Sequence, residues 1–187
     1  MIGLHADYSP YYLRLTHWLI KSGDIYMAEQ SLAGALNDIQ YQESIYKKAL
    51  TRFTANIIDN INEVLFSETD LKKALIQFYD GALSVYLATP EQLSCFITCT
   101  APVEATTNAA VKELLFSAIL DIDNSIEKRL KKAQQSGWQP KESTEHLAKM
   151  LHGVLHSIAI RARSGESPEV LKQFAYSSVN LIVGNEE

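Results

Sequence analysis

The amino-acid sequence predicts an all-α protein. Apolar residues recur at steps of three and four along most of the chain, the spacing that places side chains on one face of a helix. Helix-start signals such as Ser167-Pro168-Glu169 interrupt this pattern at intervals. No stretch alternates apolar and polar residues as a half-buried strand does, and there is no internal repeat. A length of 187 residues with 47% apolar and 21% charged residues fits one domain, or one domain with a small appendage.

The clearest helical pattern is a hairpin from Ser143 to Val183. Its two helices are separated by a turn at Ser164–Pro168, where Gly165 can end the first helix and Ser167 can cap the second. Both helices carry more apolar residues than they can bury against each other. The hairpin therefore needs the rest of the chain, a second copy of the chain, or both.

The N-terminal part predicts two short helices. Ser9-Pro10 opens the first, from about Tyr11 to Ser22, and Gly23 ends it. Met27–Leu36 forms the second, and Asn37-Asp38 marks a break or a new cap.

The middle of the chain predicts three longer helices. The first is an amphipathic helix from Glu43 to about Phe66, and the second follows the capping stretch Ser67–Asp70 and runs to Ala88. The segment Gln92–Thr100 leaves its state open because it mixes β-branched residues and cysteine, and Ala101-Pro102 is expected to close it. The third long helix spans about Asn108 to Gln135.

Composition excludes several classes of protein. The net charge of −5 disfavours unspecific attraction to nucleic acid or to acidic membranes, and no apolar run approaches the ~20 residues that span a bilayer. The first residues lack the basic and apolar regions of a secretory signal, so a cytoplasmic location is expected. The two cysteines lie in an apolar segment without nearby cations, which favours small buried residues over a redox pair.

Catalytic motifs are missing from the sequence, so we expect neither an enzyme nor a cofactor. Asp121 and Asp123 lie two apart, a spacing that faces different ways on a helix and usually indicates a solvated edge. His152 and His156 lie four apart on one helix face, which can place two imidazoles on a metal, but a third ligand at matching spacing is missing. Partly buried or interfacial histidines are the preferred interpretation, and no metal is expected.

Several short sequence motifs occur in the same order as in one family of helical proteins. They are Glu43–Phe53 at the start of a long helix, Ser94–Ile97, Arg129–Gly137 at the end of another long helix, and Ile160–Gly165. The chain from about Gln42 to Gly184 thereby resembles the ligand-binding domain of the TetR family of transcriptional regulators. This resemblance implies a helical bundle of about eight to nine helices that dimerises through the C-terminal hairpin, with residues 43–187 as the ligand-binding and dimerisation domain.

The resemblance also implies a cavity for a small, largely apolar ligand between the long helices. The alternative for any one of these side chains is ordinary core packing, which is the commoner role of an aromatic residue at helical spacing. The expected cavity residues are Ile57, Ile61, Phe78, Tyr79, Tyr86, Cys95, Cys99, Phe116, Ile119 and His152. The same resemblance predicts a homodimer buried through Leu151, Leu155, Phe174, Ser178 and Ile182.

Residues 1–42 should hold the helix-turn-helix of such a regulator, and here the sequence departs from the family pattern. Tyr11–Gly23 can serve as its first helix, but only Asn37–Gln42 remains for a recognition helix. No lysine or arginine occurs from Gly23 to Tyr46, although phosphate contacts supply much of the affinity for DNA. The nearest cations that could contact a DNA backbone are Lys21, Lys47 and Lys48.

Two functions remain open on the sequence. One is a TetR-like regulator that responds to a small apolar ligand. The other is a dimeric helical binding or interaction protein that has lost DNA recognition, which the absence of cations between Gly23 and Tyr46 favours.

Overall fold

A computed structural model of the chain describes residues 39–88, 96–99 and 101–184. Within these ranges every regular element is a helix and no strand occurs, so the all-α prediction is confirmed. The expected helices Tyr11–Ser22 and Met27–Leu36 lie outside the described residues. Among the described helices, none is both long and apolar enough to cross a membrane.

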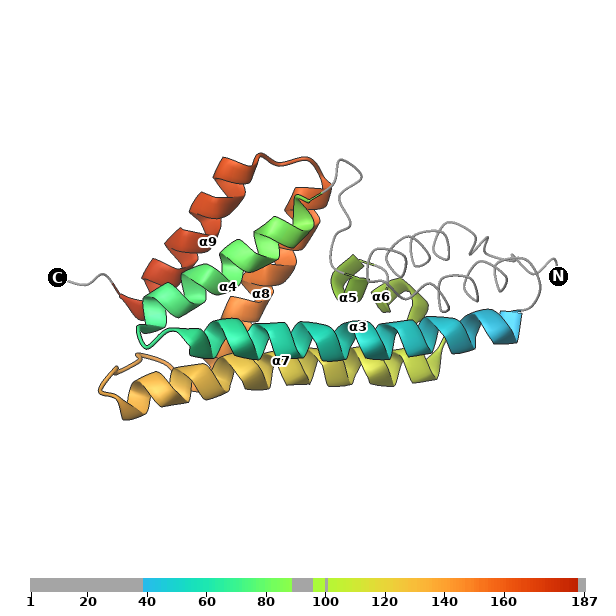
Figure 1. Cartoon of the computed structure of the whole chain (residues 1–187), viewed down its shortest axis with the longest axis horizontal. Coiled ribbons are helices and arrows are strands. Elements are labelled where there is room, and N and C mark those ends of the chain that lie inside the picture. Colours follow the sequence, from blue (N-terminus) through green and yellow to red (C-terminus); the bar gives the residue numbers. More distant parts are fainter. Residues whose placement is uncertain (1–38, 89–95, 100, 185–187) are drawn as a thin grey trace. The chain divides into compact units, whose positions relative to one another are not determined.

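The chain divides into two compact units, Met1–Phe53 and Thr54–Glu187. The boundary lies within the long helix α3 (Ile39–Ser67), so only the first part of this helix is described for the first unit. All other described helices belong to the second unit (Figure 1). They are α4 (Leu71–Tyr86), α5 (Phe96–Cys99), α6 (Ala101–Glu104), α7 (Ala109–Gln135), α8 (Thr144–Arg163) and α9 (Pro168–Val183).

Side-chain caps begin four of these helices. Ser143 and Ser167 accept hydrogen bonds from the backbone N–H of His146 at 3.2 Å and of Val170 at 3.4 Å, which starts α8 and α9 where the sequence predicts them. Asp70 and Asn108 cap α4 and α7 in the same way. Each cap satisfies one of the N–H groups that a helix leaves unpaired in its first turn.

Two short helices lie where the sequence leaves the secondary structure open or predicts a boundary. Residues 96–99 form the short helix α5, so the state that the sequence leaves open is helical there. A boundary does lie at the expected place, since α5 ends at Cys99, but Ala101-Pro102 belongs to the first turn of the next helix, α6. Proline fits the first turn of a helix, where its missing N–H would have no partner in any case.

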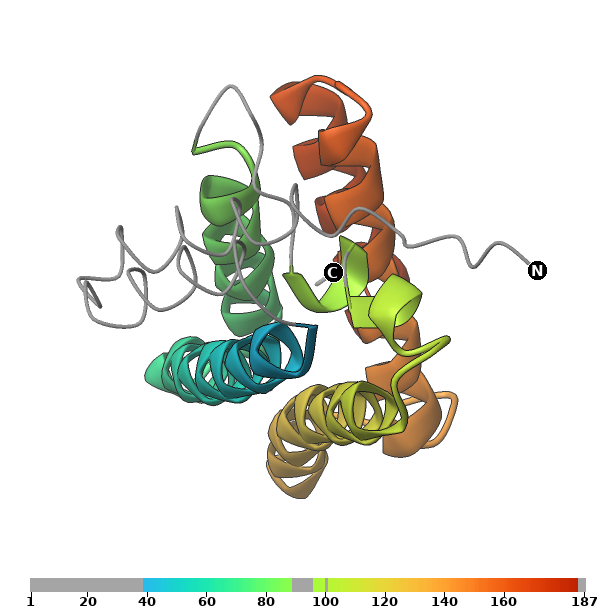
Figure 2. The ribbon, with the colours of Figure 1, turned by 90° about the vertical axis from the view of Figure 1, so that its right-hand side faces the viewer.

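Helix α8 is the central helix of the second unit. It packs against α4, α7 and α9, and α4 also packs against α9. Figure 2 shows α8 (orange) between α7 (yellow) and α9 (red). The fully buried residues of this core include Leu75 and Tyr79 of α4, Ile126 of α7, and Leu151 and Ile158 of α8.

Arg129 of α7 fastens the connection between α3 and α4. Its side chain is only 1% exposed. Its Nε donates to the carbonyl of Leu65 at 2.8 Å, and its Nη2 donates to the carbonyls of Glu68 at 3.3 Å and Thr69 at 2.8 Å. These are carbonyls of the last turn of α3 and of the turn beyond it, which the helix itself does not pair. One buried guanidinium therefore satisfies three acceptors at the point where the chain reverses.

The turn between α8 and α9 requires a glycine. Gly165 has φ of +90°, a conformation that side chains with a Cβ rarely adopt. Its N–H donates to the carbonyl of Ala162, and the N–H of Glu166 donates to the carbonyl of Arg161, both at 3.1 Å. This pair of bonds is the Schellman motif, and it ends α8 at the predicted position.

Candidate functional site

The most unusual polar group in the second unit is a pair of histidines on α8 with an aspartate on α7. His152 is 3% exposed, and its Nδ1 lies 2.6 Å from Oδ1 of Asp123. The rings of His152 and His156 lie one helical turn apart, with centroids separated by 4.3 Å. We refer to Asp123, His152 and His156 as the histidine cluster.

Two nitrogen atoms of the histidine cluster have no partner. Nε2 of His152 and Nε2 of His156 are both buried, and neither makes a hydrogen bond within the described part of the chain. A buried polar atom without a partner costs about 1–3 kcal/mol, so such atoms are uncommon in folded proteins. Two of them on adjacent turns of one helix indicate a place where another polar group can bind.

Burial keeps both histidines neutral at pH 7. It lowers the pKa of His156 to about 4, and the neighbouring His152 lowers it further while Asp123 opposes the shift. Burial also lowers the pKa of His152 below its ordinary value, against the hydrogen bond and the charge of Asp123. The neutral imidazole of His152 therefore donates Nδ1–H to the carboxylate and presents Nε2 as an acceptor.

A second buried hydrogen bond lies next to the histidine cluster. The hydroxyl of Tyr79 on α4 donates to the carbonyl of Leu151 at 2.7 Å, which is the residue before His152. Phe78 packs edge-on against Tyr79, with ring centroids 5.1 Å apart. Burial strongly raises the pKa of Tyr79, so its hydroxyl keeps its proton and links α4 to α8 at this point.

The predicted cavity residues fall into three groups. Ile61, Phe78, Tyr79, Tyr86 and His152 are buried, and Ile57 and Ile119 are half-buried. Phe116 is 63% exposed on α7, so it does not line an interior cavity of the single chain. Cys95 and the side chain of Cys99 lie outside the described residues. Of these residues, Phe78 and Tyr79 are in direct ring contact, and the hydroxyl of Tyr79 bonds to the carbonyl of Leu151, next to His152.

The predicted dimer residues divide between the inside and the outside of the hairpin. Leu151 and Leu155 are buried within the single chain, so a second copy could not reach them without opening the bundle. Phe174 is exposed, and Ser178 and Ile182 are half-buried. The exposed apolar residues around them are Met150 and Ile160 on α8 and Val170 and Leu181 on α9.

Both helices of the hairpin carry exposed apolar residues, and one contact joins their outer sides. Arg161 of α8 places its guanidinium 5.6 Å from the ring centre of Phe174 on α9, and its Nη1 pairs with Glu166 at 3.1 Å. Val170, Phe174 and Leu181 follow the same side of α9 at helical spacing, and Leu181 is 86% exposed. We call the surface formed by Met150, Ile160, Val170, Phe174 and Leu181 the hairpin face.

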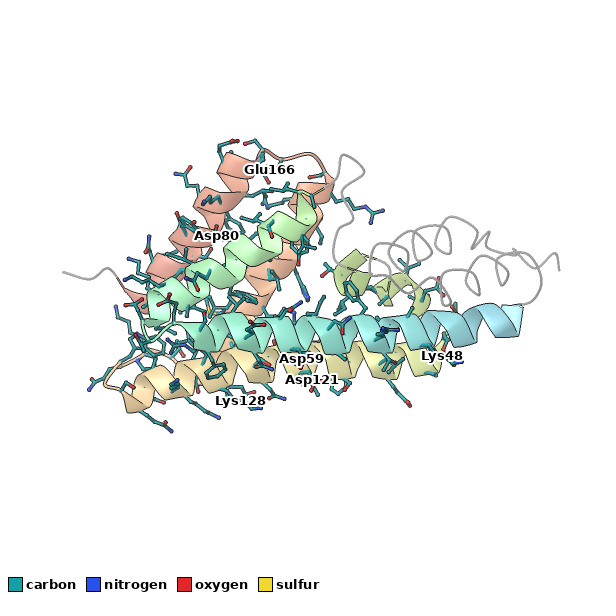
Figure 3. The ribbon with its side chains drawn as sticks, in the orientation of Figure 1. Lys48, Asp59, Asp80, Asp121, Lys128 and Glu166 are labelled. Atoms are coloured by element: carbon teal, nitrogen blue, oxygen red, sulfur yellow. The ribbon has the colours of Figure 1, made fainter. Side chains whose placement is uncertain are left out.

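The remaining candidate residues concern DNA. Lys48 is exposed and Lys47 is half-buried on α3, in the first unit, and Lys48 is labelled in Figure 3. Lys21 lies outside the described residues. In the described ranges, no group of three or more histidine, cysteine, aspartate or glutamate residues could hold a metal ion.

Asp123 is the residue of the candidate site that the sequence pattern misjudges. The solvated edge expected for Asp121 and Asp123 is correct for Asp121, which is exposed (labelled in Figure 3), but wrong for Asp123, whose side chain is 14% exposed and bound to His152. The two partners are 29 positions apart in sequence, so no local spacing links them. The one feature of the sequence that points to this site is the spacing of His152 and His156, four positions apart.

Comparison with protein-family models, with curated proteins and with solved structures finds no match to this chain.

Proposed function

We propose that this protein is a homodimeric regulator of the TetR type whose C-terminal unit responds to a small, largely apolar ligand. The observation that carries the proposal is the hairpin face, a set of exposed apolar residues on both helices of a C-terminal antiparallel hairpin. Contiguous exposed apolar patches on soluble proteins usually mark interaction sites. A two-fold axis would pair the same face of two copies into a four-helix bundle.

The ligand part of the proposal is supported by the histidine cluster. Ligand sites combine an apolar lining with a few polar groups that fix the orientation of the ligand. The unpartnered Nε2 atoms lie on α8, the helix that also contributes Met150 and Ile160 to the hairpin face. A ligand bound at His152 would thus act on the same rigid helix that contacts the second copy, which is how binding can favour one arrangement of two subunits over another.

A second candidate is a dimeric helical binding protein that does not recognise DNA. The specific observation in its favour is the run from Gly23 to Tyr46, which holds four acidic residues and no lysine or arginine. DNA-binding proteins neutralise several phosphates with cations, so this charge distribution opposes the usual docking of a helix-turn-helix.

The dimer is tested by sedimentation of the full chain and of Leu181→Glu. Leu181 is 86% exposed in the single chain, so a carboxylate there leaves the fold intact but faces its own copy in the dimer. Val85→Glu on α4, at a position 60% exposed, is the matched control because it adds the same charge to another exposed apolar site. We expect a dimer for the wild type and the control and a monomer for Leu181→Glu. A monomeric wild type, or a Leu181→Glu variant as dimeric as the wild type, overturns the proposed dimer.

A fluorescence-polarisation titration separates the two candidates. The full chain is titrated into a labelled random-sequence duplex at low salt, where phosphate contacts have their largest effect. Saturable binding that weakens as salt is added supports the regulator. The absence of binding at low salt supports the dimeric binding protein without DNA recognition.

A further inference from the structure

The geometry of the histidine cluster restricts what it can bind. Asp123 Oδ1 lies 2.6 Å from Nδ1 of His152, which is the distance of a strong hydrogen bond to a carboxylate. A carboxylate can only accept, so the proton of the neutral ring is on Nδ1 and the lone pair is on Nε2. Nε2 of His152 is therefore a buried acceptor for which the described residues supply no donor.

The charge of the histidine cluster excludes anionic ligands. The two imidazoles are neutral at pH 7, so the remaining charge is that of the Asp123 carboxylate. An anion brought beside it would be repelled in surroundings where charges are poorly screened. A buried ammonium group would lose its hydration with only the second oxygen of Asp123 to replace it, because Oδ1 is already bound to His152. A neutral hydrogen-bond donor meets neither cost.

A metal ion is a weaker match to the same atoms. A carboxylate behind a histidine does occur around zinc, where it orients the ring and raises its basicity. Zinc sites normally use three or four protein ligands, however, and the described residues supply no such set around His152 and His156.

We propose that His152 and His156 bind the hydroxyl group of a small neutral molecule, with Asp123 as the positioning residue that keeps Nε2 of His152 an acceptor. The hydroxyl donates to Nε2 of His152, and its oxygen can accept from an Nε2–H tautomer of His156. The proposal rests on the ligand-responsive function proposed above and adds the chemical class of the ligand: an apolar molecule with one alcohol or phenol group.

The neighbouring helix α5 adds a further unpaired polar atom. It packs against α8, which carries both histidines. Oγ1 of Thr98 on α5 is also buried without a hydrogen-bond partner in the described part of the chain. Helices α5 and α8 thus carry two imidazoles and a hydroxyl whose hydrogen-bonding capacity is unused among the described residues, in a unit whose other buried residues are mostly apolar.

The test uses the full chain and two probes of nearly equal shape, p-cresol and p-xylene, which differ by a hydroxyl in place of a methyl group. Long-range ¹H–¹⁵N spectra of the imidazoles report which ring nitrogen is protonated and which one a probe perturbs. In the free protein we expect His152 to be protonated on Nδ1 and not on Nε2. Addition of p-cresol should shift Nε2 of His152, and p-cresol should bind about fivefold more tightly than p-xylene, the ratio that one net hydrogen bond supplies.

Three variants separate recognition from general disruption. His152→Leu should remove the preference for p-cresol, while His146→Leu, at an exposed histidine of the same helix, should keep it. Asp123→Asn removes the charge that holds the proton on Nδ1, so it should increase the Nε2–H tautomer of His152 and reduce the preference. Because the Asp123→Asn readout is the nitrogen spectrum of a folded protein, it remains informative if His152→Leu fails to fold.

Several outcomes would overturn the inference. Equal affinity for the two probes would mean an apolar site without hydroxyl recognition. If neither probe shifts the imidazole ¹⁵N signals up to its solubility limit, the Nε2 atoms bind only buried water or have no hydrogen-bond partner at all. Tight binding of ZnCl₂ at both rings without any response to p-cresol would assign the cluster to a metal. None of these results affects the sedimentation and DNA titrations, so failure of the hydroxyl proposal and failure of the proposed function can be told apart.

Discussion

Replacement of Arg129 by methionine should destabilise the second unit more than any surface substitution. The variant keeps an unbranched stem but removes the guanidinium that donates to the carbonyls of Leu65, Glu68 and Thr69. Part of this loss is offset, because it is unfavourable to keep a charged guanidinium buried. Burial accordingly lowers the pKa of Arg129, and the charge of Asp70 acts in the opposite direction.

The magnitude follows from the three hydrogen bonds. A bond from a charged donor contributes about 1.5–3 kcal/mol, and two of the three bonds are short. Thr69 is exposed and Glu68 is half-buried, so water can replace the bond to at least the first of these carbonyls, whereas the carbonyl of the fully buried Leu65 loses its donor. Because the variant also avoids the cost of burying the charged arginine, we expect the free energy of unfolding to fall by about 3 kcal/mol.

Urea unfolding followed by circular dichroism measures this loss. The matched control is Lys128→Met, which removes a positive charge from the adjacent, exposed position of α7 (labelled in Figure 3). In urea, the free energy of unfolding of the control should stay within roughly 0.5 kcal/mol of the wild type. In a thermal melt, Arg129→Met should lower the melting temperature by roughly 6–12 °C for a chain of this size. An Arg129→Met variant as stable as Lys128→Met would refute the assignment of Arg129 as the residue that fastens the end of α3.

Three further results are expected. Between pH 6.5 and pH 5 the free energy of unfolding should fall by about 1 kcal/mol more in the wild type than in His156→Leu. The unfolded chain binds a proton at this histidine near pH 6.5, whereas burial lowers the pKa of His156 in the folded chain to about 4. The expected value is about half of what the full pKa difference would give, because the ring keeps some contact with solvent. Tyr176→Phe should cost about 1 kcal/mol in urea unfolding, because its hydroxyl lies 2.9 and 2.8 Å from the two oxygens of Asp80 and links α9 to α4. Gly165→Ala should cost about 1 kcal/mol by thermal melting, since its φ of +90° is strained for alanine, whereas Gly81→Ala, inside α4 and in open space, should gain about 0.5–1 kcal/mol.

Local signals explain why the helix boundaries of the second unit could be predicted. The caps Asp70, Asn108, Ser143 and Ser167 and the glycine at position 165 act within a few residues of their own position. Their effect therefore does not depend on the rest of the fold. The start of α6 is the exception, because Ala101-Pro102 is equally consistent with the end of one segment and the first turn of the next.

Contacts between distant residues explain what could not be predicted. The bond of Asp123 to His152 and the bonds of Arg129 to the end of α3 both join separate helices, and their residue types alone suggest solvent exposure. The orientation of α8 was ambiguous for another reason. Apolar residues occupy several of its sides, so periodicity does not distinguish Leu151, which is buried, from Met150, which is exposed.

The loop between α7 and α8 has a consequence for how the hairpin can move. Trp138 in this loop donates its indole N–H to the carbonyl of Val183, the last residue of α9, at 3.3 Å. The Gly165 turn thus joins α9 to α8 at one end, and the Trp138 bond holds the other end of α9 against the loop that precedes α8. Because α8 also packs along α9, we expect a displacement of α8 at His152 to move α9 with it rather than to open the hairpin.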